Sequence, residues 1–460
     1  MARGKKKEEL TLEEKLERAL VPVDEQPYEV PENWCWVRIG SISQVVSGGT
    51  PTTSNKEFYE NGNVPWISPA DLSGYKNKYI SCGAKMITRL GLEKSSAKLL
   101  PKNTVCLSTR APIGYVVIAE TELSTNQGFK SFCPSPAFIP EYLYWYLKGN
   151  KELLEERASG TTFLELSGNK AAKIEFPLPP LEEQKRIVEQ IESLFAKLNE
   201  AKEKVQEVLN NYAVRKASIL QKAFKGELTI QWRQENNIDM DTWEDKQLDA
   251  VCKSIFDGDH MPPPKSESGV HFLVISNVNQ GYLSFENTRY VSQEYYNNLT
   301  ETRKPEVGDI LYTLVGSYGI PIVVDSDIPF CFQRHMGLLK LNKINTIFLW
   351  YQMQSNEFYN NVTNIANGTA QLTVPIKGLR KIKVSCPSEG EQKEIVRILD
   401  NLLKKNNETK QIAKSVLHKI SLLQKSILAK AFRGELGTNN QKEKSSMELL
   451  KKLLQKPKSK

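Results

Sequence analysis

The chain has 460 residues, more than one hydrophobic core usually organises, so we expect two to four domains of ordinary size. Apolar residues make up 40% of the composition and charged residues 25%, which excludes a largely disordered chain. The 62 Lys+Arg exceed the 54 Asp+Glu, for a net charge of +8. This surplus permits nucleic acid, an acidic protein or a membrane surface as partner, and it selects none of them.

The cysteine pattern and the apolar runs exclude further classes of protein. Seven cysteines are widely scattered and never form a Cys-x-x-Cys pair, so we expect neither a disulfide framework nor a zinc site. Residues Met1–Glu9 are charged, and no run approaches the roughly 18 apolar residues that a bilayer demands. We therefore expect a cytoplasmic protein that has no contact with a membrane.

An amphipathic segment, expected to be helical within residues 1–30, precedes a first mixed domain over residues 31–180. Val105–Ser108 has the β-branched character of a strand, whereas Glu141–Leu147 is rich in Tyr, Trp and Leu and is expected to be a helix. Short strand-like runs alternate with turn residues elsewhere in this domain. This pattern predicts an α+β domain with a twisted sheet.

Polar residues gather in the connections of this first domain. Arg, Asn and Gln can hydrogen-bond base edges, and Ser and Thr commonly contact phosphates. The glycine-rich run Ser47–Thr52 lacks the phosphate-loop pattern and is more often an ordinary turn, and Arg110 could equally be an ion-pair partner. The candidate DNA-binding residues of this domain are Ser47, Thr50, Thr52, Ser108, Thr109, Arg110, Asn126 and Gln127.

A long helix is predicted within residues 181–228. Prolines precede it, Gly226 follows its last apolar turn, and a helix from about Glu182 to Phe224 would rise at ~1.5 Å per residue to roughly 60 Å. Its apolar or small residues alternate in spacing between four and three, which is typical of a coiled-coil seam. The seam positions are Ile187, Ile191, Leu194, Leu198, Ala201, Val205, Val208 and Tyr212.

A second mixed domain is expected over residues 229–387, with a strand at Ile310–Thr313 and a helix at Thr346–Met353. The run from Asp257 to His260 resembles a metal or acid-base cluster, but a turn with solvated acids is more common, and His335 has no companion ligand. Arg334 could also be an ion-pair partner. The candidate DNA-binding residues here are Asp257, His260, Ser317, Tyr318, Gln333, Arg334 and His335.

A second long helix is predicted within residues 388–436, followed by a Lys-rich tail over residues 437–460. Asn406 interrupts its seam and would be costly unless paired, although a polar seam residue can fix the register. The tail is expected to be partly disordered or a frayed helix, with Met447–Leu450 able to pack against Leu10–Leu20. The second seam comprises Ile395, Leu399, Leu402, Asn406, Thr409, Ala413, Val416 and Ile420.

The chain contains an internal repeat. Glu183–Val188 returns as Glu391–Val396 at an offset of 391 − 183 = 208 residues, and Ile219–Leu228 returns as Ile427–Leu436 at the same offset. The dipeptide Gly160-Thr161 returns likewise as Gly368-Thr369, whereas the interiors between these anchors differ. A duplicated frame with diverged interiors suits recognition of two different targets at a fixed separation; simple drift after duplication is the alternative.

Several catalytic motifs are missing from the sequence. It contains no Walker A loop, no H-E-x-x-H, no G-x-S-x-G and no Asn-Pro-Pro-aromatic tetrapeptide. We therefore expect a non-catalytic chain. Two other readings stay open: a coiled-coil scaffold that binds other proteins, and a stand-alone enzyme of an unfamiliar kind.

The motifs at both ends of each long helix resemble those of the specificity subunits of type I restriction-modification systems. Phe176–Val188 and Ala223–Leu228 carry the resemblance, and their second copies at one offset extend it over nearly the whole chain. Pro31–Trp34 and the dipeptide Gly258-Asp259 followed by His260 add to it. The second copy departs from the family pattern, because Ser388-Glu389-Gly390 stands where the first has Pro180-Leu181-Glu182.

The resemblance implies an α+β fold of two similar target-recognition domains separated by two long antiparallel coiled-coil helices, with pseudo-two-fold symmetry. Each domain would read one half of a bipartite double-stranded DNA sequence, and helix length would set the gap. The chain would bind no cofactor itself. It would dock two adenine-N6 methyltransferase subunits that bind S-adenosylmethionine, and it could recruit two restriction subunits that use ATP and Mg.

The resemblance also implies that the methyltransferases dock on the helix faces around residues 183–212 and 391–420. The candidate docking or coiled-coil residues are Glu183, Gln184, Ile187, Ile191, Leu194, Leu198, Glu391, Gln392, Ile395, Leu399, Leu402 and Asn406.

Overall fold

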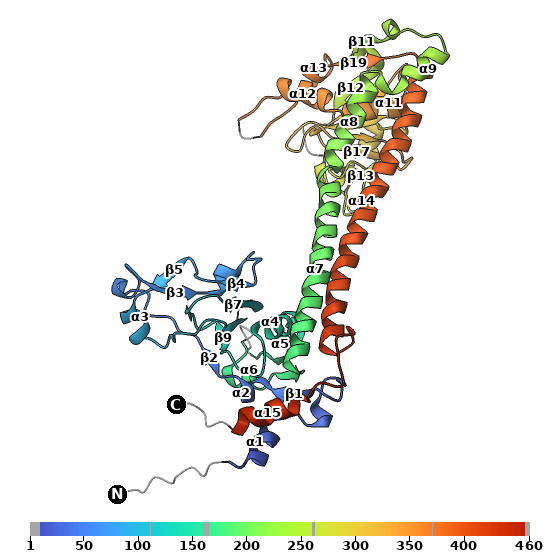
Figure 1. The fold of residues 1–460 in the computed structure, drawn as a ribbon. Coiled ribbons are helices and arrows are strands. Elements are labelled where there is room, and N and C mark those ends of the chain that lie inside the picture. Colours follow the sequence, from blue (N-terminus) through green and yellow to red (C-terminus); the bar gives the residue numbers. More distant parts are fainter. Residues whose placement is uncertain (1–9, 111, 160–164, 260–262, 370, 456–460) are drawn as a thin grey trace. The chain divides into compact units, whose positions relative to one another are not determined.

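The computed structural model describes residues 10–110, 112–159, 165–259, 263–369 and 371–455 (Figure 1). The chain divides into two compact units, one made of residues 1–203 and 417–460 and the other of residues 204–416. Both divisions fall inside long helices, α7 (Leu181–Asn210) and α14 (Glu389–Phe432). Each unit therefore contains one mixed domain and a part of each long helix.

The mixed domain of the first unit contains a five-stranded sheet, a three-stranded sheet and a two-stranded ribbon. The five-stranded sheet has the order β2 (Val45–Ser47), β9 (Phe129–Phe132), β6 (Val105–Thr109), β7 (Ile113–Ala119), β4 (Tyr79–Ile80). The three-stranded sheet is β5 (Lys85–Ile87), β3 (Val64–Ile67), β8 (Ser124–Thr125), and the ribbon is β1 (Cys35–Arg38) with β10 (Glu175–Leu178). The helices of this unit outside α7 and α14 are α1 (Leu12–Ala19), α2 (Ile39–Ile42), α3 (Arg89–Glu93), α4 (Pro140–Gly149), α5 (Lys151–Arg157), α6 (Gly168–Ala172) and α15 (Ser446–Gln455).

The second unit repeats this arrangement with one strand fewer in its larger sheet. Its four-stranded sheet has the order β12 (Cys252–Asp257), β18 (Met336–Leu341), β15 (Ile310–Thr313), β16 (Pro321–Val323). A three-stranded sheet, β14 (Arg289–Val291), β13 (Val270–Leu273), β17 (Phe330–Phe332), and a ribbon, β11 (Glu244–Gln247) with β19 (Lys383–Cys386), complete it. Its helices outside α7 and α14 are α8 (Tyr212–Phe224), α9 (Ile230–Glu235), α10 (Gln293–Asn298), α11 (Thr346–Met353), α12 (Asn356–Ile365) and α13 (Ile376–Leu379).

Apart from β4, the strands of the two domains correspond, which confirms the predicted duplicated α+β fold. Strand β6 pairs with β9 as β15 pairs with β18. Strand β3 pairs in parallel with β8, and β13 pairs in parallel with β17. The predicted strands and helices fall on β6, β15, α4 and α11. In the described part of the second domain, β4 has no counterpart.

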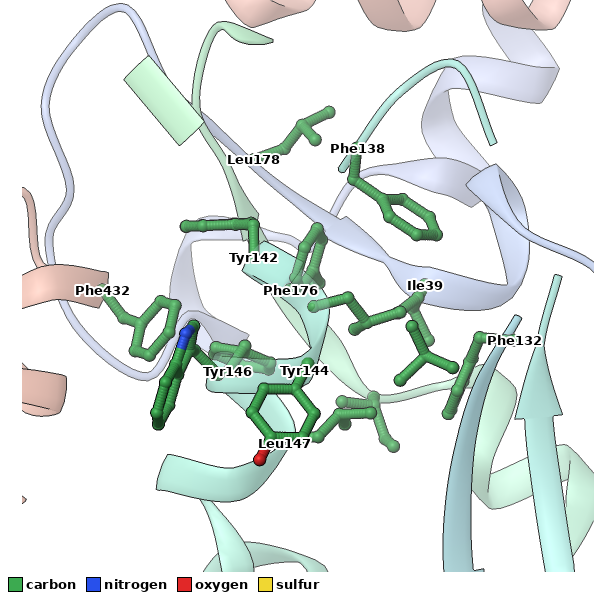
Figure 2. Close-up of a cluster of buried hydrophobic side chains, with 14 of the residues drawn as sticks. Ile39, Phe132, Phe138, Tyr142, Tyr144, Tyr146, Leu147, Phe176, Leu178 and Phe432 are labelled. Carbon is green, nitrogen blue, oxygen red and sulfur yellow. The ribbon is translucent and has the colours of Figure 1, made fainter. Parts of the chain in front are cut away.

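The aromatic helix α4 anchors the first domain to the end of α14. Tyr142 and Tyr146 pack edge-on against Phe176 of β10 and against Phe432, with ring centroids 5.1–5.5 Å apart (Figure 2). The Tyr142 hydroxyl also donates to the Pro177 carbonyl at 3.0 Å. Because buried aromatic side chains remove large areas from water and favour edge-to-face contacts, this cluster is a major source of cohesion in the first unit.

The long helices run antiparallel within each unit. In the first unit, the Gln424 amide donates to Asn199 at 3.3 Å; in the second, Leu220 packs with Ile395 and Leu399. The predicted seam of α7 is confirmed by its burial, since Ile187 and Ile191 are buried and the later seam positions are half-buried between exposed neighbours. Glycines in the left-handed region follow both helix ends, at Gly226 (φ 71°) and Gly434 (φ 73°), as expected for stop signals.

The two long helices differ from the prediction at Asn211 and at Thr409 and agree with it elsewhere. The first is interrupted at Asn211, which separates α7 from α8. The second, α14, is continuous over 44 residues despite the altered motif at its start. Thr409 is exposed and bonds back to the Lys405 carbonyl at 2.8 Å, so it does not belong to the seam, whereas Asn406 is paired with the Tyr212 carbonyl at 3.4 Å.

Within the C-terminal tail, residues Ser446–Gln455 form the helix α15. Leu450 of α15 is buried, and Met447, Leu453 and Leu454 pack against the same core as Leu16 of α1. The predicted packing of the two terminal segments is therefore confirmed. Among the described residues, no helix combines the length and the apolar character needed to cross a bilayer.

The repeated Glu-Gln dipeptide fastens each domain to the start of its long helix. Glu183 accepts a hydrogen bond from the Trp34 indole at 2.8 Å, and Glu391 accepts one from the Trp243 indole at 2.9 Å. The adjacent glutamine accepts from the backbone N–H of Ile139 in the first unit at 3.0 Å, and its copy accepts from that of Asn345 in the second at 2.9 Å. These side chains are buried and their polar atoms are used inside the fold.

The burial of these residues corrects part of the predicted docking surface. The side chains that cannot meet a partner because they are buried are Glu183, Gln184, Ile187, Ile191, Glu391, Gln392, Ile395 and Leu399. They belong to the fold and the seam. Half-buried Leu194, Leu198, Leu402 and Asn406 line the same seam.

The two buried carboxylates, Glu183 and Glu391, have different hydrogen-bond partners. Glu391 pairs with the buried Arg233 guanidinium at 2.6 Å and accepts from the Thr229 hydroxyl at 2.6 Å. Glu183 has neutral donors instead, Trp34 and the Asn439 amide, each at 2.8 Å. Burial therefore raises the pKa of the Glu183 carboxyl, although both donors partly oppose this shift.

We predict that Glu391→Gln destabilises the second unit far more than Glu183→Gln destabilises the first. The Glu391 variant leaves Arg233 buried without a counter-charge, which typically costs about 3–5 kcal/mol. The Glu183 variant keeps an amide oxygen that accepts from Trp34 and Asn439, so we expect a loss of about 1 kcal/mol or less. Hydrogen exchange of the full chain, read separately for each unit, measures both effects, and equal losses would contradict the assignment.

A pH dependence of the first unit follows from Glu183. Because its folded pKa lies above its ordinary value of 4.5, the fold favours the uncharged carboxyl. This contribution to stability is complete below the unfolded pKa and is lost as the pH rises through the folded pKa. Glu183→Gln should flatten the stability of the first unit over this pH range in urea titrations, and an unchanged pH profile would show that Glu183 is not the titrating group.

Candidate nucleic-acid interface

Three connections meet at one end of the five-stranded sheet in the first domain. The residues after β2 are hydrogen-bonded to those around β8 and β9. Gly49 N donates to the Thr125 carbonyl at 2.8 Å, and the Thr50 hydroxyl donates to the Gln127 side chain. The end of β6 joins them, because Thr109 N donates to the Gly128 carbonyl at 2.8 Å. We call this group, Ser47–Thr52 with Arg110 and Asn126–Gly128, the first loop cluster.

The same three connections meet in the second domain. Gly258 N donates to the Met336 carbonyl at 3.3 Å, Asp259 bridges to Gln333, and Leu314 N donates to the His335 carbonyl at 2.7 Å. We call residues 257–259, 315–319 and 333–335 the second loop cluster. In both copies, the fold therefore brings together the connections that contain the residues predicted from the sequence.

A glycine in each cluster allows the loops to touch. A Cβ on Gly48 would lie 1.9 Å from the Asn126 carbonyl oxygen, and one on Gly258 would lie 2.2 Å from the Phe332 carbonyl oxygen. Any side chain at either position would push the two connections apart. These glycines serve a close backbone contact between loops.

The candidate residues of the first loop cluster are not equally accessible. Ser47, Thr52, Arg110 and Gln127 are exposed, whereas Thr50 and Asn126 are half-exposed, Asn126 accepting from the Gly128 amide at 2.9 Å. The exposed side chains present hydroxyl, guanidinium and amide groups to the solvent. They remain available to a ligand.

Ser108 and Thr109 are corrections to the prediction. Both lie inside β6 and are buried, not in a connection. The Ser108 hydroxyl donates to the Pro112 carbonyl and accepts from Tyr115 N, both at 2.8 Å, and the Thr109 hydroxyl donates to Gly128. Their hydrogen bonds shape the loop that follows, so they cannot contact DNA in this conformation.

Arg110 of the first loop cluster belongs to a group of three charged side chains, with Lys130 and Glu165 beside the cluster. Glu165 lies 3.9 Å from the Arg110 guanidinium and 3.7 Å from the Lys130 ammonium. Arg110 and Glu165 side chains are 45% and 40% exposed, whereas Lys130 is nearly buried. Burial lowers the pKa of Lys130, while Glu165 opposes this shift and Arg110 adds to it.

The second loop cluster exposes Ser317 and Arg334, with Asp257, Tyr318, Gln333 and His335 half-exposed. Burial, and secondarily the Arg334 charge, lower the pKa of His335. The Tyr318 hydroxyl donates to the Thr363 hydroxyl at 3.2 Å, and the Tyr318 ring stacks on that of Tyr359. The candidate His260 lies outside the described residues.

The acidic run of the second cluster is tied into the fold. Asp259 accepts from the Tyr295 hydroxyl and forms an ion pair with Arg303. Burial and the bond to Asp259 raise the pKa of Tyr295. No group of three His, Cys, Asp or Glu side chains is placed to hold a metal ion within the ranges that the structure describes.

The sequence did not predict the antiparallel bridge beside each cluster, between Ser159 and Glu165 in the first domain and between Asn367 and Thr373 in the second. Glu165 exchanges two backbone hydrogen bonds with Ser159, and Thr373 exchanges two with Asn367. Each bridge then joins its cluster, since Glu165 bridges to Arg110 and Thr373 to Val315. The repeated Gly-Thr pair at the 208-residue offset was the signal; Gly160 and Thr161 themselves lie outside the described residues.

We predict that Gly48→Ala opens the first loop cluster. The added methyl group must displace the Asn126 carbonyl, and overpacking of this kind typically costs about 1–3 kcal/mol. Faster hydrogen exchange at Gly49 and Thr109, whose amides bond across the cluster, would report the opening. Ser47→Ala, at the exposed neighbour, is the matched control, and equal exchange in both variants would refute the close contact.

The geometry defines a class of protein with two α+β domains, each of which has a cluster of exposed polar loops at one end of its sheet. The domains are attached to antiparallel helices, and no described part of these helices could span a membrane. The family model described as the type I restriction modification DNA specificity domain matches residues 31–211 and again residues 240–418. The chain belongs to this family.

Individual relatives agree with this assignment. The chain is 40% identical over 188 residues to the type I restriction enzyme MjaIX specificity subunit of Methanocaldococcus jannaschii, a match that covers 40% of this chain and 43% of that subunit. It is 28% identical over 411 residues to the MjaVIII specificity subunit of the same organism, covering 86% and 92% of the two chains.

Solved structures share the fold. The HsdS subunit from Thermoanaerobacter tengcongensis aligns with a TM-score of 0.61 at 19% identity, over 90% of this chain and all of that one. A chain solved in a study of complex assembly and conformational transition of the type I R-M system aligns with a TM-score of 0.68 at 20% identity, over 89% of this chain. These matches confirm the two-domain architecture with its long helices.

Proposed function

We propose that the first and second loop clusters are the surfaces with which this DNA-specificity chain reads the two halves of a bipartite duplex. The observation that carries the proposal is that the same three connections converge in both domains while their exposed side chains differ. A shared frame with different side chains is what two unlike half-sites require. The chain contributes recognition, and catalysis belongs to its partner subunits.

The exposed side chains have the chemistry of base and phosphate contacts. Arg334 can donate two hydrogen bonds to the O6 and N7 atoms of guanine, and Gln127 and Gln333 can pair with adenine. The hydroxyls of Ser47, Thr52 and Ser317 suit phosphate oxygens, which position a protein on DNA. The half-exposed candidates Thr50, Asn126, Asp257, Tyr318 and His335 flank these groups.

We further propose that two methyltransferase subunits dock on equivalent exposed positions of the helices. Val214 on α8 and Leu422 on α14 are related by the 208-residue offset, and they are 66% and 52% exposed. Exposed apolar side chains at repeat-related positions fit two copies of one partner. Such partners would be adenine-N6 methyltransferases that bind S-adenosylmethionine, and restriction subunits that use ATP and Mg would join them.

DNA reading can be tested with a pair of charge variants. Arg334→Gln removes an exposed charge of the second loop cluster, whereas Lys343→Gln removes one at the opposite end of the same strand, β18. We expect Arg334→Gln to weaken binding or change the preferred base in one half-site only, by about 1–3 kcal/mol, and Lys343→Gln to act weakly. Binding selections from a random duplex pool measure both.

Salt dependence separates DNA reading from protein scaffolding. A chain that contacts several phosphates should lose affinity steeply with the logarithm of salt concentration, because bound counterions are released. No enrichment of any split sequence, or a uniform loss in both half-sites on changing Arg334, would reject the proposal.

The docking proposal makes a separate prediction. Val214→Asp and Leu422→Asp should each remove one methyltransferase from the assembled complex, since a charge cannot be buried there without a partner. Native mass spectrometry with the cognate methyltransferase should then find one copy in each single variant and none in the double variant. Retention of two copies in both single variants would place docking elsewhere.

A further inference from the structure

The loops that follow β6 and β15 can be aligned residue by residue. The Ser108 hydroxyl donates to the Pro112 carbonyl and accepts from Tyr115 N, and the Thr313 hydroxyl donates to the Ser317 carbonyl and accepts from Ile320 N. Both loops therefore have the same length between equivalent hydrogen bonds. In this alignment Arg110 is equivalent to Val315, and Ile113 is equivalent to Tyr318.

The neighbouring elements agree with this alignment. Arg110 bridges to Glu165 as Val315 bridges to Thr373. On β6, Leu107 pairs with Lys130. At the equivalent position of β15, Tyr312 pairs with Gly337. The charged group of the first cluster, Arg110 with Lys130 and Glu165, is thus replaced in the second by Val315, Gly337 and Thr373.

The second cluster is aromatic and apolar at the same place. The Tyr318 and Tyr359 rings are parallel within 3°, with centroids 5.7 Å apart, and the Tyr359 side chain is substantially exposed. Leu372, next to Thr373 in the chain, is also exposed. The two domains therefore present different chemistry on equivalent backbone.

The charged group is not a closed structural ion pair. Its separations of 3.9 and 3.7 Å are too long for hydrogen bonds, whereas Arg186 and Glu443 of the same unit form two at 2.8 and 2.9 Å. Arg110 and Glu165 also keep nearly half of their side-chain surface open to solvent. Both retain donors and acceptors for a ligand, and nearly buried Lys130 acts as a positioning residue for Glu165.

We infer that the two half-sites differ in base class at the place of this charged group: there the first domain reads a G·C pair through Arg110 and Glu165, and the second reads an A·T pair through Val315 and Tyr318. A guanidinium donates to guanine O6 and N7, and a carboxylate accepts from the cytosine amino group. Apolar and aromatic side chains have no such partner on G·C but can contact the thymine methyl group. This inference rests on the proposed reading of DNA by the loop clusters.

The test uses the full chain, a random duplex pool and two modified bases. Wild-type selection should yield a split sequence; the half that changes with Arg334→Gln belongs to the second domain, and the other half to the first. In the first half, replacing guanine by 7-deazaguanine should weaken wild-type binding about 10–100-fold and should have little effect on Arg110→Ala. Glu165→Gln should relax the same base pair.

In the second half, replacing thymine by uracil, which lacks the methyl group, should weaken wild-type binding several-fold and should have little effect on Val315→Ala. Circular dichroism and unchanged reading of the opposite half show that each variant is folded. If no split sequence is selected, the proposed function fails. If one is selected but 7-deazaguanine does not weaken binding through the first half, or uracil does not weaken it through the second, the inference is overturned and the proposed function stands.

Discussion

The fold depends on one interaction that is made twice: a buried glutamate at the start of a long helix accepts a hydrogen bond from the indole of a tryptophan at the start of a domain. The pairs are Trp34 with Glu183 and Trp243 with Glu391. Because the adjacent glutamine holds the N-terminus of α4 or α11, three distant segments are fixed at one point. The position of each loop cluster relative to its own helix follows from this attachment.

The equivalent carboxylate is bound by a guanidinium in one unit and by an indole and an amide in the other. A buried ion pair requires an ionised carboxyl and is costly to break, whereas burial without a paired cation raises the pKa of Glu183 even though its neutral donors oppose the shift. The duplicated frame has therefore kept its geometry while its electrostatics diverged. The loop clusters show the same behaviour, since equivalent hydrogen bonds close the loop that contains Arg110 in one domain and the loop that contains Val315 in the other.

The sequence predicted the fold well because its strongest signals are periodic or repeated. The spacing of Ile187, Ile191 and Leu194 identified the helix, and the offset between the Glu-Gln dipeptides identified the duplication. The candidate site was predicted less well, because residue type does not report burial: Ser108 looks like a phosphate contact but bonds inside its own loop. Glu165 was missed because its neighbour Arg110 is distant in sequence and meets it only through an antiparallel bridge.

The attachment of the C-terminal segment to the first unit has a consequence for synthesis on the ribosome. Asn439 donates to Glu183, and Ser446 bonds to Asn33, more than 400 residues earlier in the chain. The unit that contains residues 204–416 is complete before these last partners emerge, so the first domain to be translated is the last to close. Until Asn439 emerges, Glu183 lacks this partner, which makes this unit the slower of the two to mature.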